Sequence, residues 1–132
     1  MKKKEKRFKK TRRGNLKKYI FKTGKLNFGT VGLKALNSGI LTAKQIESAR
    51  QAIVRKTGRK GKLWIKVFPN IPITSKPTGS RMGKGKGSIS HFGFKVRAGF
   101  ILFELCGINF VNAKEAFKTG GAKLPIKTSI TY

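Results

Sequence analysis

Residues 76–88, KPTGSRMGKGKGS, constrain the fold most, because they can form neither a regular strand nor a buried helix. These thirteen residues contain four glycines, one proline, four cations and no acid. Glycine alternates with lysine from Gly83 to Gly87, which leaves backbone N–H groups uncovered while ammonium groups project between them. A flexible solvent loop is the alternative interpretation, but such a loop does not require four positive charges. We therefore interpret the segment as a loop that contacts the phosphates of a polyanion.

The charge of the whole chain favours the same class of partner. Its 132 residues include 32 Lys and Arg against four Asp and Glu, a formal net charge of +28. Charge of this size in so short a chain repels itself unless a polyanion neutralises it, and nucleic acid is the expected partner. Disorder is the competing interpretation of high net charge. A hydrophobic fraction of 38%, with ten Phe, instead favours one folded domain with basic extensions.

The residue inventory gives little support to catalysis or metal binding. Cys106 and His91 are the only residues of their types, and the four glutamates are scattered, so we expect no catalytic constellation, zinc site or disulfide. The glycines of the loop fit neither the Walker nor the GxGxxG spacing. No apolar run approaches the roughly 18 residues of a transmembrane helix. We therefore expect no enzyme activity, cofactor, metal or membrane association, and no homo-oligomer.

Two further basic regions are candidate RNA contacts. Residues 1–27 form a basic N-terminal extension, the basic arm, in which the first 25 residues carry thirteen Lys and Arg. Such a block is usually disordered until a polyanion orders it. A mitochondrial transit peptide is the alternative, although this arm favours Lys and contains no Ser. The candidate residues are Lys9, Lys10, Arg12, Arg13, Lys17 and Lys18 in the arm, and Arg50, Arg55, Lys56, Arg59, Lys60 and Lys62 at and beyond the end of an expected helix.

Residues 28–132 are predicted to form a single α+β domain. We expect a small mixed or antiparallel sheet with two helices packed on it, and the loop 76–88 inserted. Alternation of apolar and polar residues predicts strands over 28–36, 63–68 and 124–130, with Pro125 marking a sheet edge. The same pattern predicts a hairpin of 92–97 with 100–105. Trp64 is assigned to the core, with base stacking as the alternative.

Capping residues place the two helices. Thr42 and Gln45 form a capping box at the start of the first helix, which is predicted to run to about Thr57. Asn112 is predicted to cap the second helix, whose apolar side is Ala113, Ala116 and Phe117. Gly120 and Gly121 are predicted to end it.

Seven stretches in this order resemble the ribosomal protein L16 family of the large subunit, of the bacterial and organellar type. They are FGTVGLKAL (28–36), LTAKQIESARQAI (41–53), GKLWIKVFP (61–69), PITSKP (72–77), RMGKGKG (81–87), GFILFELCG (99–107), and AKEAF with AKLPIKT (113–117 and 122–128). The resemblance implies an α+β fold, a structural role in the large subunit, and binding to its rRNA and neighbouring proteins. It also implies that the loop approaches tRNA near the peptidyl transferase region, through Lys76, Arg81, Met82, Gly83, Lys84, Gly85, Lys86 and Gly87.

The alternative function is that of a histone-like, nucleic-acid-compacting protein. Such a protein shares the charge but more often carries symmetric dimer elements or minor-groove wedges. Lysine outnumbers arginine 24 to 8, as in AT-rich coding sequences, and the resemblance begins within the first ten residues. The arm is therefore expected to be the family's own, which favours a mitochondrial ribosome in the matrix over a ribosome of a bacterial cytoplasm or a plastid stroma.

Overall fold

The computed structural model describes residues 10–14, 16, 19–20 and 25–132. Within these residues the chain forms seven strands and two helices, which confirms the predicted α+β class. The elements, in order, are β1 (Val31–Ala35), β2 (Gly39–Thr42), α1 (Ala43–Lys56), β3 (Lys62–Ile65), β4 (Ile71–Ser75), β5 (Ser88–Val96), β6 (Ile101–Cys106), α2 (Phe110–Gly121) and β7 (Thr128–Thr131).

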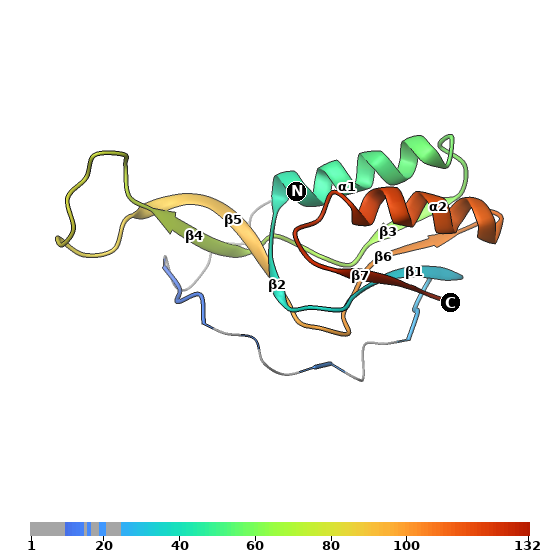
Figure 1. Cartoon of the computed structure of the whole chain (residues 1–132), viewed down its shortest axis with the longest axis horizontal. Coiled ribbons are helices and arrows are strands. Elements are labelled where there is room, and N and C mark those ends of the chain that lie inside the picture. The colour runs from blue at the N-terminus through green and yellow to red at the C-terminus, as the bar shows by residue number, and fades with distance from the viewer. Residues whose placement is uncertain (1–9, 15, 17–18, 21–24) are drawn as a thin grey trace.

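The strands of the described chain are divided between two antiparallel sheets. Sheet A has the order β3-β6-β1-β7, and sheet B has the order β2-β5-β4. Helices α1 and α2 lie side by side over one face of sheet A, while β4 and β5 extend away from this layer (Figure 1). The predicted edge position of the last strand is confirmed, although β7 begins only at Thr128. Pro72 lies in the edge strand β4, where a missing N–H costs little.

The predicted hairpin of 92–97 with 100–105 is wrong. Strand β5 pairs with β2 and β4, whereas β6 pairs with β1 and β3. Between them Gly99 has φ +90 and donates its N–H to the carbonyl of Ala35 at 2.7 Å, so the chain crosses from one sheet to the other. The hairpin partner of β5 is β4, and the loop 76–88 connects these two strands.

The start of α1 confirms the predicted capping box. The Gln45 N–H donates to Thr42 Oγ1 at 3.3 Å, and the Thr42 N–H donates to Gln45 Oε1 at 2.9 Å. The prediction that Asn112 caps α2 is wrong, because α2 begins at Phe110 with Asn109 before it. The Ala113 N–H donates to the carbonyl of Asn109 at 3.0 Å, which is the first helical hydrogen bond.

The main core lies between the helices and sheet A. Val31, Leu33 and Ala35 of β1 and the three predicted apolar residues of α2 are all buried. Gly120 and Gly121 are also buried, and they form the last turn of α2 where it passes close to α1 and β7. The buried apolar residues of this core include Val31, Leu33, Ala35, Ile46, Ala49, Ile53, Phe103, Leu105, Ala113, Ala116 and Phe117.

In the described part of the basic arm, residues 10–14 lie beside sheet B, and residues 19–20 and 25–27 lie along the face of sheet A opposite the helices (Figure 1). The Ile20 N–H donates to the carbonyl of Ala98 at 2.9 Å. Leu26 lies over Gly32, where a β-carbon would collide with the Leu26 side chain. Of the candidate arm residues, Lys9, Lys17 and Lys18 lie outside the described residues.

Candidate nucleic-acid interface

The loop that the sequence predicts over 76–88 connects β4 to β5 and projects at one end of the long axis (Figure 1). Ser88 is the first residue of β5, so residues 76–87 form the loop itself, named here the Gly/Lys loop. Its side chains are exposed, and Met82 is 98% exposed. The segment is therefore available for contact with a partner over its whole length.

Positive backbone φ angles explain the glycines at the tip of the Gly/Lys loop. Gly83 and Gly85 have φ of +97 and +78, and Lys84 between them has φ +50. A β-carbon built on either glycine meets nothing within 4 Å, so packing inside the protein does not exclude a side chain there. The left-handed conformation itself favours glycine at these positions.

Lysine side chains fix the shape of the Gly/Lys loop and join it to the arm. Lys76 Nζ donates to the carbonyl of Gly83 across the loop. Lys86 Nζ donates to the carbonyl of Thr11 at 2.5 Å, and Lys10 Nζ donates to the carbonyl of Lys86 at 2.8 Å. Arg81 and Lys84 are exposed and form no ion pair or hydrogen bond within the described residues. These two cations remain for an external anion.

The arm and the base of the loop enclose a shallow cationic pocket. Lys95 on β5 donates its Nζ to the carbonyl of Arg12 at 2.8 Å. The pocket has a volume of about 160 Å³, and Thr11, Arg13, Lys86 and Lys95 are among its lining residues. The structure thus brings Lys10, Arg12 and Arg13 together with the loop. Sequence reasoning missed Lys95 as a site residue, because its contact with the arm joins positions far apart in the chain.

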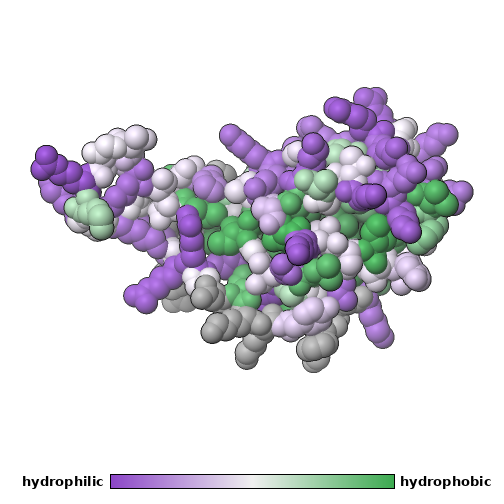
Figure 2. Space-filling model, in the orientation of Figure 1, coloured by the Kyte–Doolittle hydropathy of each residue, from purple (hydrophilic) through white to green (hydrophobic). Residues whose placement is uncertain are grey.

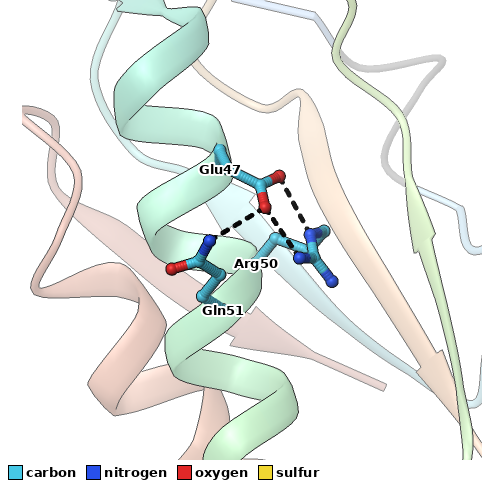
Figure 3. A network of polar contacts seen from close by, with 3 residues as sticks. All are labelled: Glu47, Arg50 and Gln51. Carbon is cyan, nitrogen blue, oxygen red and sulfur yellow. Dashed lines mark hydrogen bonds and ion pairs between the residues drawn. The ribbon is translucent and has the colours of Figure 1, made fainter.

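The second predicted cluster lies at the C-terminal end of α1, at the other end of the molecule from the loop (Figure 1). Hydrophilic side chains gather at both of these ends (Figure 2). Arg50 forms a two-pronged contact with Glu47, at 2.9 Å from Nε and 2.7 Å from Nη2, and Gln51 joins it at 3.1 Å (Figure 3). Lys56 pairs with Glu115 of α2 at 3.0 Å. Two of the predicted cations are therefore partly neutralised within the protein.

The contact with Glu47 affects how Arg50 can bind an external anion. The hydrogen bond with Glu47 raises the pKa of Arg50, and the hydrogen bonds from Arg50 and Gln51 lower the pKa of Glu47. Both groups thus stay charged at neutral pH. Phosphate binding by Arg50 would have to compete with the Glu47 carboxylate.

Three other cations of this cluster carry no such contact. Arg55, Arg59 and Lys60 are exposed, and none forms an ion pair or side-chain hydrogen bond in the part of the chain that the structure describes. Arg59 and Lys60 border a pocket of about 220 Å³ whose lining includes Val54, Leu63 and Leu105. Their charge is available to a polyanion.

Lys62 lies apart from these cations, in a group of aromatic and basic side chains on β3. Its Nζ is 5.2 Å from the centroid of the Trp64 ring, which stacks on Phe28 with centroids 5.9 Å apart. Trp64 is half-buried, so its assignment to the core is correct only in part. Sequence reasoning missed Phe28 and Lys66 in this group, because their positions depend on a contact that is distant in the chain.

That contact is made by Glu104, which is fully buried in β6. Its Oε2 accepts hydrogen bonds from the N–H groups of Asn27, Phe28 and Gly29, at 3.2, 2.7 and 3.0 Å. Its Oε1 lies 3.4 Å from Lys66 Nζ. The carboxylate therefore holds the junction between the arm and β1.

Among the described residues, no three His, Cys, Asp or Glu side chains are close enough to hold a metal ion. Neither described helix has the length and apolar character needed to cross a membrane.

Comparisons of the sequence with a family model and with known proteins agree on one family. The model of the family "Ribosomal protein L16p/L10e" matches residues 2–131. The "Large ribosomal subunit protein uL16" of Bartonella henselae is 55% identical over 103 residues, which cover 78% of this chain and 75% of that protein. The protein of the same name from Chelativorans sp. (strain BNC1) is 54% identical over the same lengths. Both relatives are bacterial.

Proposed function

Because the chain belongs to the ribosomal protein L16p/L10e family, it is a structural component of the large ribosomal subunit and not an enzyme, and we propose that its Gly/Lys loop contacts tRNA. Family membership implies association with large-subunit rRNA and ribosomal proteins. It gives no support to the alternative of a histone-like compacting protein. What remains to be assigned is which residues make which contacts.

We assign the rRNA contacts to the arm and to the end of α1. Exposed cations at both sites neutralise phosphates with little dependence on base sequence, since the folded body matches the shape of the RNA. Lys10, Arg12 and Arg13 act beside the base of the loop. Arg55, Arg59 and Lys60 act at the other end, where the acids Glu47 and Glu115 compete for Arg50 and Lys56. Lys62 acts apart from them, on β3. Lys9, Lys17 and Lys18, which lie outside the described residues, belong to this proposal as well.

The observation that carries the tRNA proposal is the shape of the Gly/Lys loop. It projects from the body at one end of the long axis, with Arg81 and Lys84 exposed beside glycines of positive φ (Figure 1). A backbone without β-carbons at Gly83 and Gly85 can approach a partner more closely than a substituted one. The loop reaches tRNA near the peptidyl transferase region and supports the placement of tRNA there.

Variants of the loop test this role directly. Arg81→Ala removes one of 32 Lys and Arg, and Gly83→Val adds a side chain that meets no protein atom within 4 Å. We expect bulk rRNA binding to change little, because the other cations still release counterions. Binding of tRNA by assembled ribosomes should weaken about tenfold, in the range of one lost charge-assisted hydrogen bond. Peptide synthesis should fall with it.

Lys118→Ala in α2 is the matched control for charge, since Lys118 is also exposed. Subunit incorporation, tRNA binding and peptide synthesis are measured for all three variants. Normal tRNA binding and peptide synthesis with both loop variants would show that the loop is a passive connection between β4 and β5.

We also propose that the ribosome is mitochondrial. The support is compositional, namely the excess of Lys over Arg and the abundance of Phe, whereas both relatives are bacterial proteins. Fractionation of cells that carry the tagged chain checks this proposal. Recovery of the chain in ribosomes outside mitochondria would overturn it.

A further inference from the structure

Two aromatic rings and two ammonium groups form one cluster on the face of sheet A opposite the helices. Phe28 and Trp64 stack with an interplanar angle of 22° and centroids 5.9 Å apart. Lys62 Nζ lies 5.2 Å from the Trp64 centroid, and Lys66 Nζ lies 4.8 Å from the Phe28 centroid. Both lysines are thus within the distance at which a cation interacts with a ring face.

The buried carboxylate of Glu104 holds this cluster in place. Trp64 is the cross-strand partner of Glu104, and Glu104 Oε2 accepts the N–H of Phe28 at 2.7 Å. The other carboxylate oxygen faces Lys66 Nζ at 3.4 Å. One buried carboxylate therefore holds both the backbone of Phe28 and the ammonium group of Lys66. Trp64 lies on β3, and Phe28 lies in the irregular segment before β1, where its hydrogen bond to Glu104 holds it.

The need to cover Trp64 does not explain why residue 28 is a phenylalanine. Any apolar side chain would cover the indole, yet Phe28 leaves 61% of its surface exposed. An exposed aromatic between two cations has the chemistry of sites where unpaired bases stack on rings while basic groups receive the phosphates. A protein partner would remove water from both ammonium groups. Its carboxylates would then have to replace the hydrogen bonds that the water made.

We infer that Phe28, Trp64, Lys62 and Lys66 form a stacking platform for an unpaired nucleobase of RNA. The base stacks on the exposed part of the Phe28 ring, and Lys62 receives an adjoining phosphate, while Lys66 stays paired with Glu104. Glu104 is a positioning residue that sets the ring of Phe28. The inference rests on the proposed function, since it assigns one contact with RNA. It adds a site that is separate from the Gly/Lys loop and from the exposed cations at the end of α1.

Fluorescence of the full-length chain tests the platform, because Trp64 is its single tryptophan. The probes are an eight-nucleotide single strand of adenosine and an abasic strand of equal length and charge. The adenosine strand should quench Trp64 fluorescence saturably, and the abasic strand should not. Phe28→Leu should weaken binding of the adenosine strand about five- to a hundredfold, the range for one base stacked on an aromatic ring. Phe28→Tyr should restore it.

Phe110→Leu is the matched control. Phe110, on α2, is also exposed, but its ring contacts the ring of Tyr132. This variant should bind like the unchanged chain, and thermal unfolding should show that all variants fold. Equal quenching by both strands, or unaltered binding by Phe28→Leu, would overturn the platform and leave a protein contact as the use of Phe28. Binding of complete large-subunit rRNA is measured in parallel. If the unchanged chain failed to bind that rRNA, the proposed function itself would be wrong.

Discussion

At the scale of single residues, Glu104 carries the most structural consequence. Burial raises the pKa of its carboxyl, but hydrogen bonds from Phe28, Gly29 and Asn27 and the contact with Lys66 outweigh burial and lower it below its ordinary value of 4.5. A carboxyl that is more acidic in the folded state binds fewer protons there than in the unfolded chain. Glu104 therefore stabilises the fold above about pH 4.5, and this stability is lost as pH falls through the lower folded pKa.

Glu104→Gln should make this contribution measurable. At pH 7 we expect the variant to lose about 2–3 kcal/mol of unfolding free energy, since charge-assisted hydrogen bonds are weakened and Lys66 loses its partner. Urea unfolding at a series of pH values gives the comparison. The difference between the two proteins should shrink on acidification below pH 4.5. If the difference in unfolding free energy stayed constant down to the lowest pH measured, the charge of Glu104 would not contribute to stability.

At the scale of elements, the contact between α1 and α2 depends on a glycine inside the second helix. A β-carbon on Gly120 would lie 2.5 Å from Ile53 Cγ1 and 2.8 Å from Ile53 Cδ1. Ile53 is fully buried, so it cannot move into solvent. The glycine allows the two helices to approach at the price of a less favourable helix residue.

Gly120→Val should therefore destabilise the fold by about 1–3 kcal/mol, as overpacking of a core usually does. Thr119→Val is the control, because Thr119 is one residue away and exposed. Urea unfolding of both variants measures the effect. Equal stability of the two would mean that the helices separate without cost.

The elements also show how far local patterns determine structure. Thr42 and Gln45 predicted the start of α1 correctly, because a capping box is a contact between near neighbours. The hairpin of 92–97 with 100–105 failed because strand partners are chosen by the whole fold, and Gly99 sends the chain to a second sheet. The sequence predicted no strand at the short β2, because its first residue, Gly39, is typical of a break between elements.

In the candidate site too, only features set by neighbouring residues could be predicted from the sequence. The Gly/Lys loop was predictable because its residues are contiguous and exclude regular structure. The ties from Lys86 and Lys95 to the arm join residues 75 and 83 positions apart, and no periodicity indicates them. The position of Phe28 depends on Glu104, 76 positions away, and was likewise outside the reach of sequence patterns.

At the scale of the whole molecule, charge is arranged along one long axis. Three of the four acids, Glu47, Glu104 and Glu115, each pair with a cation within the fold. The exposed cations of the loop and of the end of α1 lie at opposite ends (Figures 1 and 2). The protein is thus suited to bind rRNA with its body while its loop extends toward a second partner.

Crosslinking from position 82 tests this account most directly. A photo-reactive phenylalanine analogue replaces Met82, which is 98% exposed in the loop, or Val111, which is 61% exposed in the first turn of α2 at the other end of the molecule. Ribosomes assembled with each protein are loaded with tRNA and irradiated. We expect tRNA crosslinks from position 82 and none from position 111. Equal tRNA yields from the two positions, or no tRNA crosslink from position 82 in fully assembled ribosomes, would contradict the proposed place of the loop.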